Sequence, residues 1–113
     1  MARVLILGVR GVLFVTDIKR LVLDVLKPHH PTIIEVSKRL SVVEGVAGVN
    51  IAVYEVDQET ESIKITLEGP AINYDQVLET IESVGAAVHS VDLVSTGSKL
   101  VEEVPTPQDK VQR

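Results

Sequence analysis

Six segments of the chain show a regular spacing of hydrophobic residues. In four of them every second residue is apolar, which is typical of a β-strand with one buried face. In the other two the apolar residues recur at helical spacing. The predicted order is strand, helix, strand, strand, helix, strand, at residues 18–26, 31–44, 49–57, 62–68, 73–84 and 87–94. The chain therefore repeats a strand–helix–strand unit, which predicts an α+β domain.

Residues at the ends of these segments suit their boundaries. Pro28 and Pro31 follow the first strand and are expected to end it, because neither can continue a strand ladder. Asn73, with Gln76 three residues later, resembles a capping box at the start of the second helix. A chain of 113 residues is one domain. We expect it to comprise residues 18–94, with an N-terminal extension at 1–17 and a mobile polar tail at 95–113.

The order of the segments also predicts how the strands pair. A right-handed crossover makes the first two strands parallel and leaves room for one strand between them. The third strand enters this gap through its hairpin, and the fourth lies outside the first. The result is a four-stranded antiparallel sheet in the order 4-1-3-2 with both helices on one face, which is a ferredoxin-like sandwich.

The other face of the predicted sheet has no helices, yet it carries apolar side chains. Those expected on it are Val22, Leu26, Tyr54, Val56 and Val88. We also expect Arg20 of the first strand to pair with Asp92 of the last, and Asp24 to lie near Val88. Apolar side chains on an open face usually mark a partner, and the two edge strands also need protection. We therefore expect a homo-oligomer.

Charge and composition exclude several classes of partner. Residues 18–94 hold six Lys and Arg against twelve Asp and Glu, and the whole chain has a net charge of −5. An acidic domain without a basic stripe is not expected to bind nucleic acid. The apolar N-terminal segment is too short for a membrane span and lacks a signal-peptide cleavage site. The chain has no cysteine, which suits a reducing cytoplasm.

Several strings of the sequence resemble an archaeal family catalogued as domain-of-unknown-function family 211. They lie at residues 21–29, 44–51, 54–57, 63–69 and 88–92. The resemblance covers residues 18–94. It implies a ferredoxin-like fold and a multi-subunit ring, and it implies no established activity.

The chain departs from this family at its start. Family members typically begin a few residues before the position of Ile18, so residues 1–16 are extra. They are interpreted either as an added strand or as an upstream stretch included through a misplaced start codon. The second interpretation is favoured, because valine and leucine codons can initiate translation in such organisms.

Three carboxylates are candidate metal ligands at one end of the sheet. Asp57 lies beside the hairpin tip, Glu55 precedes it on the same strand, and Asp24 interrupts an aliphatic strand nearby. Carboxylate oxygens suit a hard divalent cation such as calcium or magnesium. An acid within an aliphatic strand is costly unless it faces water, is paired or coordinates a cation. The alternative is a hairpin tip that is simply solvated.

The three histidines are candidate ligand-binding residues. His29 and His30 lie in the loop after the first strand, and His89 lies in the last strand, where we expect it to face the helices or the sheet edge. Imidazole would favour zinc or nickel over calcium. The alternatives are exposed loop histidines and a satisfied core or interface histidine.

Three classes of function remain open. A non-catalytic oligomeric module that binds a small ligand or a divalent cation is favoured over an enzyme using a histidine as acid or base. An enzyme is disfavoured because no serine lies in a Gly-flanked elbow and no phosphate-binding loop is present. The third class is a structural adaptor for another protein.

Overall fold

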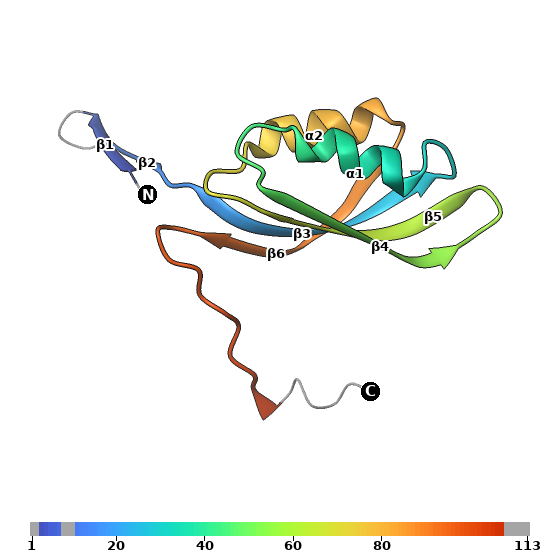
Figure 1. The fold of residues 1–113 in the computed structure, drawn as a ribbon. Coiled ribbons are helices and arrows are strands. Elements are labelled where there is room, and N and C mark those ends of the chain that lie inside the picture. Colours follow the sequence, from blue (N-terminus) through green and yellow to red (C-terminus); the bar gives the residue numbers. More distant parts are fainter. Residues whose placement is uncertain (1–2, 8–10, 108–113) are drawn as a thin grey trace.

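The computed structural model describes residues 3–7 and 11–107. Its main sheet has four antiparallel strands in the order β4-β5-β3-β6, and a separate two-stranded sheet precedes it (Figure 1). The elements are β1 (Arg3–Leu7), β2 (Gly11–Val15), β3 (Ile18–Pro28), α1 (Ile33–Ser41), β4 (Gly48–Val56), β5 (Thr60–Glu68), α2 (Tyr74–Ser83) and β6 (Ala87–Thr96). The predicted order of the four core strands is confirmed, and so is the ferredoxin-like fold.

The two central strands supply one wall of the core, and the helices supply the other. Both α1 and α2 lie on the same face of the main sheet, and its opposite face has no second layer (Figure 1). The buried strand residues are Leu21, Leu23 and Val25 of β3 and Ile63, Ile65 and Leu67 of β5. They pack with Val36, Leu40, Val77 and Ile81 of the helices. Strict alternation on β3 and β5 therefore creates one buried face and one open face, and we call the helix-free side the open face.

The start of α2 is hydrogen-bonded to the loop after α1. The Asn73 side chain accepts a hydrogen bond from the backbone N–H of Gln76, as a capping residue does. The Gln76 side chain does not return to Asn73 as in a full capping box. It accepts instead from the backbone N–H of Glu44 at 3.1 Å. The predicted helix cap is thus confirmed at Asn73, while the Gln76 side chain connects α2 to the loop after α1.

The first strand is longer, and the first helix shorter, than predicted. Strand β3 runs on to Pro28, which is opposite Thr60 of β5. Pairing with β6 has already ended at Leu26, so the proline interrupts no ladder on that side. Helix α1 begins at Ile33 rather than at Pro31.

The register of the last strand differs from the prediction. Strand β6 pairs with β3 through three register shifts, so that Arg20 is opposite Ser95 and Asp24 is opposite Ser90. Val88 is opposite Val25 and packs against the core, so its expected place on the open face is wrong. The reason is physical: each residue added at a bulge moves the rest of its strand along the partner.

A similar irregularity corrects the placement of Val56. The pairing of β4 with β5 shifts between Val53 and Glu55. Val56 is therefore opposite Glu61, which is on the same face of β5 as the buried Ile63. Val56 is exposed, but it lies on the helix side of the sheet and not on the open face.

Both ends of the chain extend beyond the sandwich. The strands β1 and β2 pair with each other as an antiparallel hairpin. After β6 the chain turns at Gly97, and residues 98–106 continue without strand or helix (Figure 1). We refer to residues 98–107 as the tail. No described helix is long and apolar enough to cross a membrane.

Candidate functional site on the open sheet face

Apolar side chains are exposed where the open face lacks a second layer. Leu26 of β3 is 46% exposed and Tyr54 of β4 is 62% exposed. The ammonium of Lys64 lies 5.8 Å from the centroid of the Tyr54 ring, within the range of a cation–π contact. The face therefore combines apolar surface with charge, as protein interfaces do.

A hollow of about 260 Å³ lies on this face beside Leu26. Its polar lining comes from three neighbouring strands: Asp24 of β3, Ser62 of β5 and His89 of β6. Within the described residues, neither the Asp24 nor the His89 side chain takes part in a hydrogen bond or an ion pair. The expectation that His89 faces the helices or the edge is wrong, because the extra residue in β6 turns it to the open face.

Arg20 anchors the other end of the open face. Its Nε donates to Glu68 at 2.8 Å, and its Nη1 donates to both carboxylate oxygens of Glu102 at 3.1 Å. The Glu68 hydrogen bond is the main cause that raises the pKa of Arg20 above its ordinary value. The expected partner, Asp92, instead accepts a hydrogen bond from Ser90 at 2.6 Å. The Arg20–Asp92 pair is wrong because the register of β6 is shifted.

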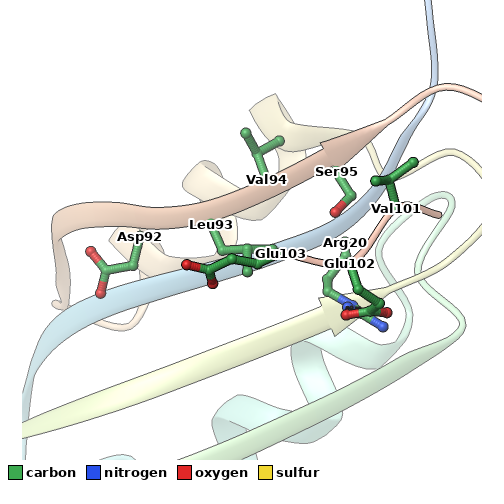
Figure 2. Close-up of a pocket in the computed structure, with 8 residues that line it drawn as sticks. All are labelled: Arg20, Asp92, Leu93, Val94, Ser95, Val101, Glu102 and Glu103. Carbon is green, nitrogen blue, oxygen red and sulfur yellow. Dashed lines mark hydrogen bonds and ion pairs between the residues drawn. The ribbon is translucent and has the colours of Figure 1, made fainter. Parts of the chain in front are cut away.

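The tail encloses a second cavity against β6. Its volume is about 550 Å³. Figure 2 shows Glu102 of the tail beside Arg20, with Val101 near Ser95 of β6. The tail thus contacts the sheet at the Arg20–Glu102 pair and leaves a gap along the neighbouring strand.

A separate polar network lies at the far end of the sheet, around the loop after β3. The His29 Nδ1 lies 3.0 Å from a carboxylate oxygen of Glu61. The Nε2 lies 3.0 Å from the carbonyl oxygen of Asp57 and 3.1 Å from that of Gln58. A carbonyl and an ionised carboxylate can only accept, so both ring nitrogens donate, and all these hydrogen bonds form together, only when the imidazole is protonated. The hydrogen bond to Glu61 accordingly raises the pKa of His29 above its ordinary value of 6.5.

Lys27 completes this network and is completely buried. Its ammonium donates to the carbonyl oxygens of Pro28 at 2.7 Å, His29 at 3.3 Å and Pro31 at 2.6 Å. It also lies 3.1 Å from the second oxygen of Glu61. The hydrogen bond from His29, followed by that from Lys27, lowers the pKa of Glu61. Lys27, His29 and Glu61, which we call the loop network, join the loop after β3 to the β4–β5 hairpin.

The pairing of Lys27 with Glu61 was not predicted from the sequence, although a signal was present. Lys27 continues the inward series of β3 after Val25, and Glu61 precedes Ile63 in the inward series of β5. Two opposite charges at inward positions on paired strands predict a buried ion pair. Treating the loop as starting at Lys27 concealed this pattern.

The structure brings together only part of the predicted site. Asp24 and His89 line one hollow. Glu55 is opposite Ser62, and Asp57 is at the hairpin, where its backbone carbonyl accepts from His29. No three His, Asp or Glu side chains of the described chain form a group that could hold a metal ion. The metal role of Asp24, Glu55 and Asp57 thus stays a prediction that no assembled set supports.

The loop histidines also occupy different environments. His29 uses both ring nitrogens in the loop network. His30 is exposed and precedes a cis peptide bond to Pro31. Of the three histidines, His89 is the one that lines a hollow of the open face.

Fold and surface together define a small ferredoxin-like domain with an uncovered sheet face. The chain belongs to the family DUF211, uncharacterized ArCR, whose model matches residues 19–110. The match continues past residue 94, where the resemblance in the sequence was expected to end, and it includes the tail. The uncharacterized protein MJ0319 of the archaeon Methanocaldococcus jannaschii is 50% identical over 93 residues, which are 82% of this chain and 96% of that protein.

Proposed function

We propose that the chain is a non-catalytic binding module that assembles with copies of itself through the open sheet face. The observation that carries the proposal is the exposure of Leu26 and Tyr54 on a face without a second layer. Covering this apolar surface would stabilise an assembly by roughly 25 cal/mol per Å² buried. Strands β4 and β6 form the two edges of the sheet, and an assembly would also protect them.

A binding role fits the side chains better than a catalytic one. The loop network occupies both nitrogens of His29, so this ring has no free position for acid–base chemistry. Asp24 and His89, in contrast, are unpaired in the described structure and line the same hollow. One copy supplies too few ligands for a metal ion, so a divalent cation or small ligand in the hollow would be completed by a second copy. We place this module in the cytoplasm, where a chain without cysteine is well suited.

The assembly surface can be tested by placing a charge on the open face. In Leu26→Lys an ammonium replaces an exposed apolar side chain of the proposed interface, so we expect light scattering to give a smaller mass. Ile34→Lys is the matched control, because Ile34 is an exposed apolar residue of α1, on the other side of the molecule. An unchanged mass for Leu26→Lys would contradict assembly through the open face.

Ligand binding in the hollow needs a separate test. Calorimetric titration with zinc, calcium and magnesium is expected to give heat with zinc first, because an imidazole favours it. Asp24→Asn should abolish this heat, while Glu59→Gln, at the exposed hairpin, should leave it unchanged. Absence of heat with all three cations would contradict metal binding and leave a protein–protein adaptor as the function.

A further inference from the structure

We propose that the tail of one copy packs on the open face of a second copy, with its Glu102 on the second copy's Arg20. This inference rests on the proposed self-association, and it names the segment that mediates it. The occupant of the open face would therefore be residues 98–107 of another chain.

The tail carries apolar side chains that its own chain does not cover. Leu100 is 37% exposed, Val101 is 70% exposed and Val104 is 75% exposed. The segment has no regular secondary structure to bury them, yet it lies inside the region that the family model matches. An extended segment with this spacing of apolar residues suits the open face, where Leu26 and Tyr54 are also uncovered.

Charge complementarity fixes where the tail meets the sheet. The Arg20 Nε donates to Glu68 of β5 at 2.8 Å, so a contact within the sheet, independent of the tail, orients the guanidinium. Glu102 places both carboxylate oxygens within 3.1 Å of one guanidinium nitrogen. The same contact can form between two copies, which is the general logic of exchanging an identical segment.

Within its own chain the tail reaches Arg20 through Glu102, and an exchanged tail would make this contact on a second copy. The tail leaves β6 after Gly97, whose φ of +102° turns the chain out of the strand (Figure 1). In its own chain it leaves a cavity of about 550 Å³ beside β6 (Figure 2). Ten extended residues reach at most about 35 Å, whereas four strands at about 4.8 Å spacing span roughly 14 Å. The tail is thus long enough to cross a neighbouring open face.

Charge reversal and mixing distinguish exchange from closure. Arg20→Glu and Glu102→Arg each place like charges at the contact, so each variant alone should raise the apparent dissociation constant of the assembly about tenfold. Mixing the two variants restores opposite charges between copies and should recover the wild-type mass by light scattering. A mixture no larger than its separate components would overturn the exchange.

The controls separate this inference from the proposed function. Glu103→Arg makes the same charge change in the next residue of the tail, and its mixture with Arg20→Glu should not recover the mass. Glu102→Ala and a chain ending at Gly97 leave the folded core intact, and both should weaken assembly. If the shortened chain assembles like wild type while Leu26→Lys does not, the tail inference fails and the proposed function stands. If the wild-type chain is monomeric, both fail.

Discussion

The loop network shows how one buried cation organises one end of the sheet. Lys27 is completely buried, but its four acceptors replace the water that it loses. Burying an ammonium is costly unless it is paired and fully hydrogen-bonded. The network meets both conditions, and it therefore links the loop after β3 to the β4–β5 hairpin.

Removing the cation should leave its partners without a donor. Lys27→Met keeps most of the side-chain volume but leaves a carboxylate oxygen of Glu61 and the carbonyl of Pro31 unpaired in a buried place. We expect the free energy of unfolding to fall by about 3–5 kcal/mol, measured by urea denaturation. Lys38→Met, at an exposed position of α1, is the matched control and should change little. Equal losses for the two variants would contradict a role for the buried pair.

The loop network also predicts a dependence of stability on pH. The pKa of His29 is raised, so its contribution is fully present below the ordinary value of 6.5 and is lost as the pH rises through the folded-state pKa. The pKa of Glu61 is lowered, so its contribution is fully present above the ordinary value of 4.5 and is lost as the pH falls through the folded-state pKa. The network is therefore complete at mildly acidic pH.

Urea denaturation across this range can isolate the histidine. Stability of the wild-type chain should decline on the alkaline side of pH 6.5, and His29→Gln should remove that part of the decline. His30→Gln is the matched control, because the neighbouring ring is exposed. Identical profiles for wild type and His29→Gln would show that the ring does not titrate with folding.

Individual site residues were only partly predictable. Asp24 was singled out as an unusual acid in an aliphatic strand, and it does line a hollow of the open face. The predicted sheet topology also placed Glu55 and Asp57 at the same end of the sheet, but Glu55 pairs with Ser62 and the three carboxylates do not form one cluster. His89 joins Asp24 through a bulge, and a single sequence does not show where a strand takes an extra residue.

At the scale of elements, the loops after α1 and β5 are in close backbone contact at two glycines. Gly45 adopts a φ of +84°, and a Cβ built on it would lie 1.6 Å from the carbonyl oxygen of Ala71. A Cβ on Gly69 would lie 1.9 Å from the carbonyl oxygen of Gly45. The loops after α1 and β5 therefore approach as closely as they do because neither glycine has a side chain.

This contact predicts a large effect from one methyl group. Gly45→Ala adds both a disfavoured φ and a clash with backbone, so we expect the melting temperature to fall, with a loss of roughly 2–4 kcal/mol in unfolding free energy. Gly48→Ala is the matched control, because a Cβ there meets nothing within 4 Å. Similar melting temperatures for Gly45→Ala and the wild-type chain would contradict the close contact.

The order and type of the core elements followed from the sequence because the periodicity is strong. Inward residues of β3 and β5 alternate strictly, and the crossover rule then leaves one sheet order for four strands. The register of β6 did not follow, because an edge strand has one partner and its bulges are not encoded by alternation. Of the two expected capping partners, Asn73 caps the helix as predicted. The Gln76 side chain instead accepts a hydrogen bond from the distant backbone N–H of Glu44.

At the scale of the molecule, the fold leaves two unsatisfied surfaces that complement each other. One is the open face, with Leu26 and Tyr54 exposed toward one end and Arg20 at the other. The other is the tail, with apolar side chains and Glu102. No described helix or strand covers the open face, and a second copy of the chain is the partner that we propose for it.

Light scattering of the wild-type chain over a dilution series tests this account most directly. One chain has a mass of 12.3 kDa. We predict a mass of at least two chains at micromolar concentration, because each copy would cover the open face of another. A mass of 12.3 kDa throughout the series would contradict assembly and, with it, the proposed exchange of tails.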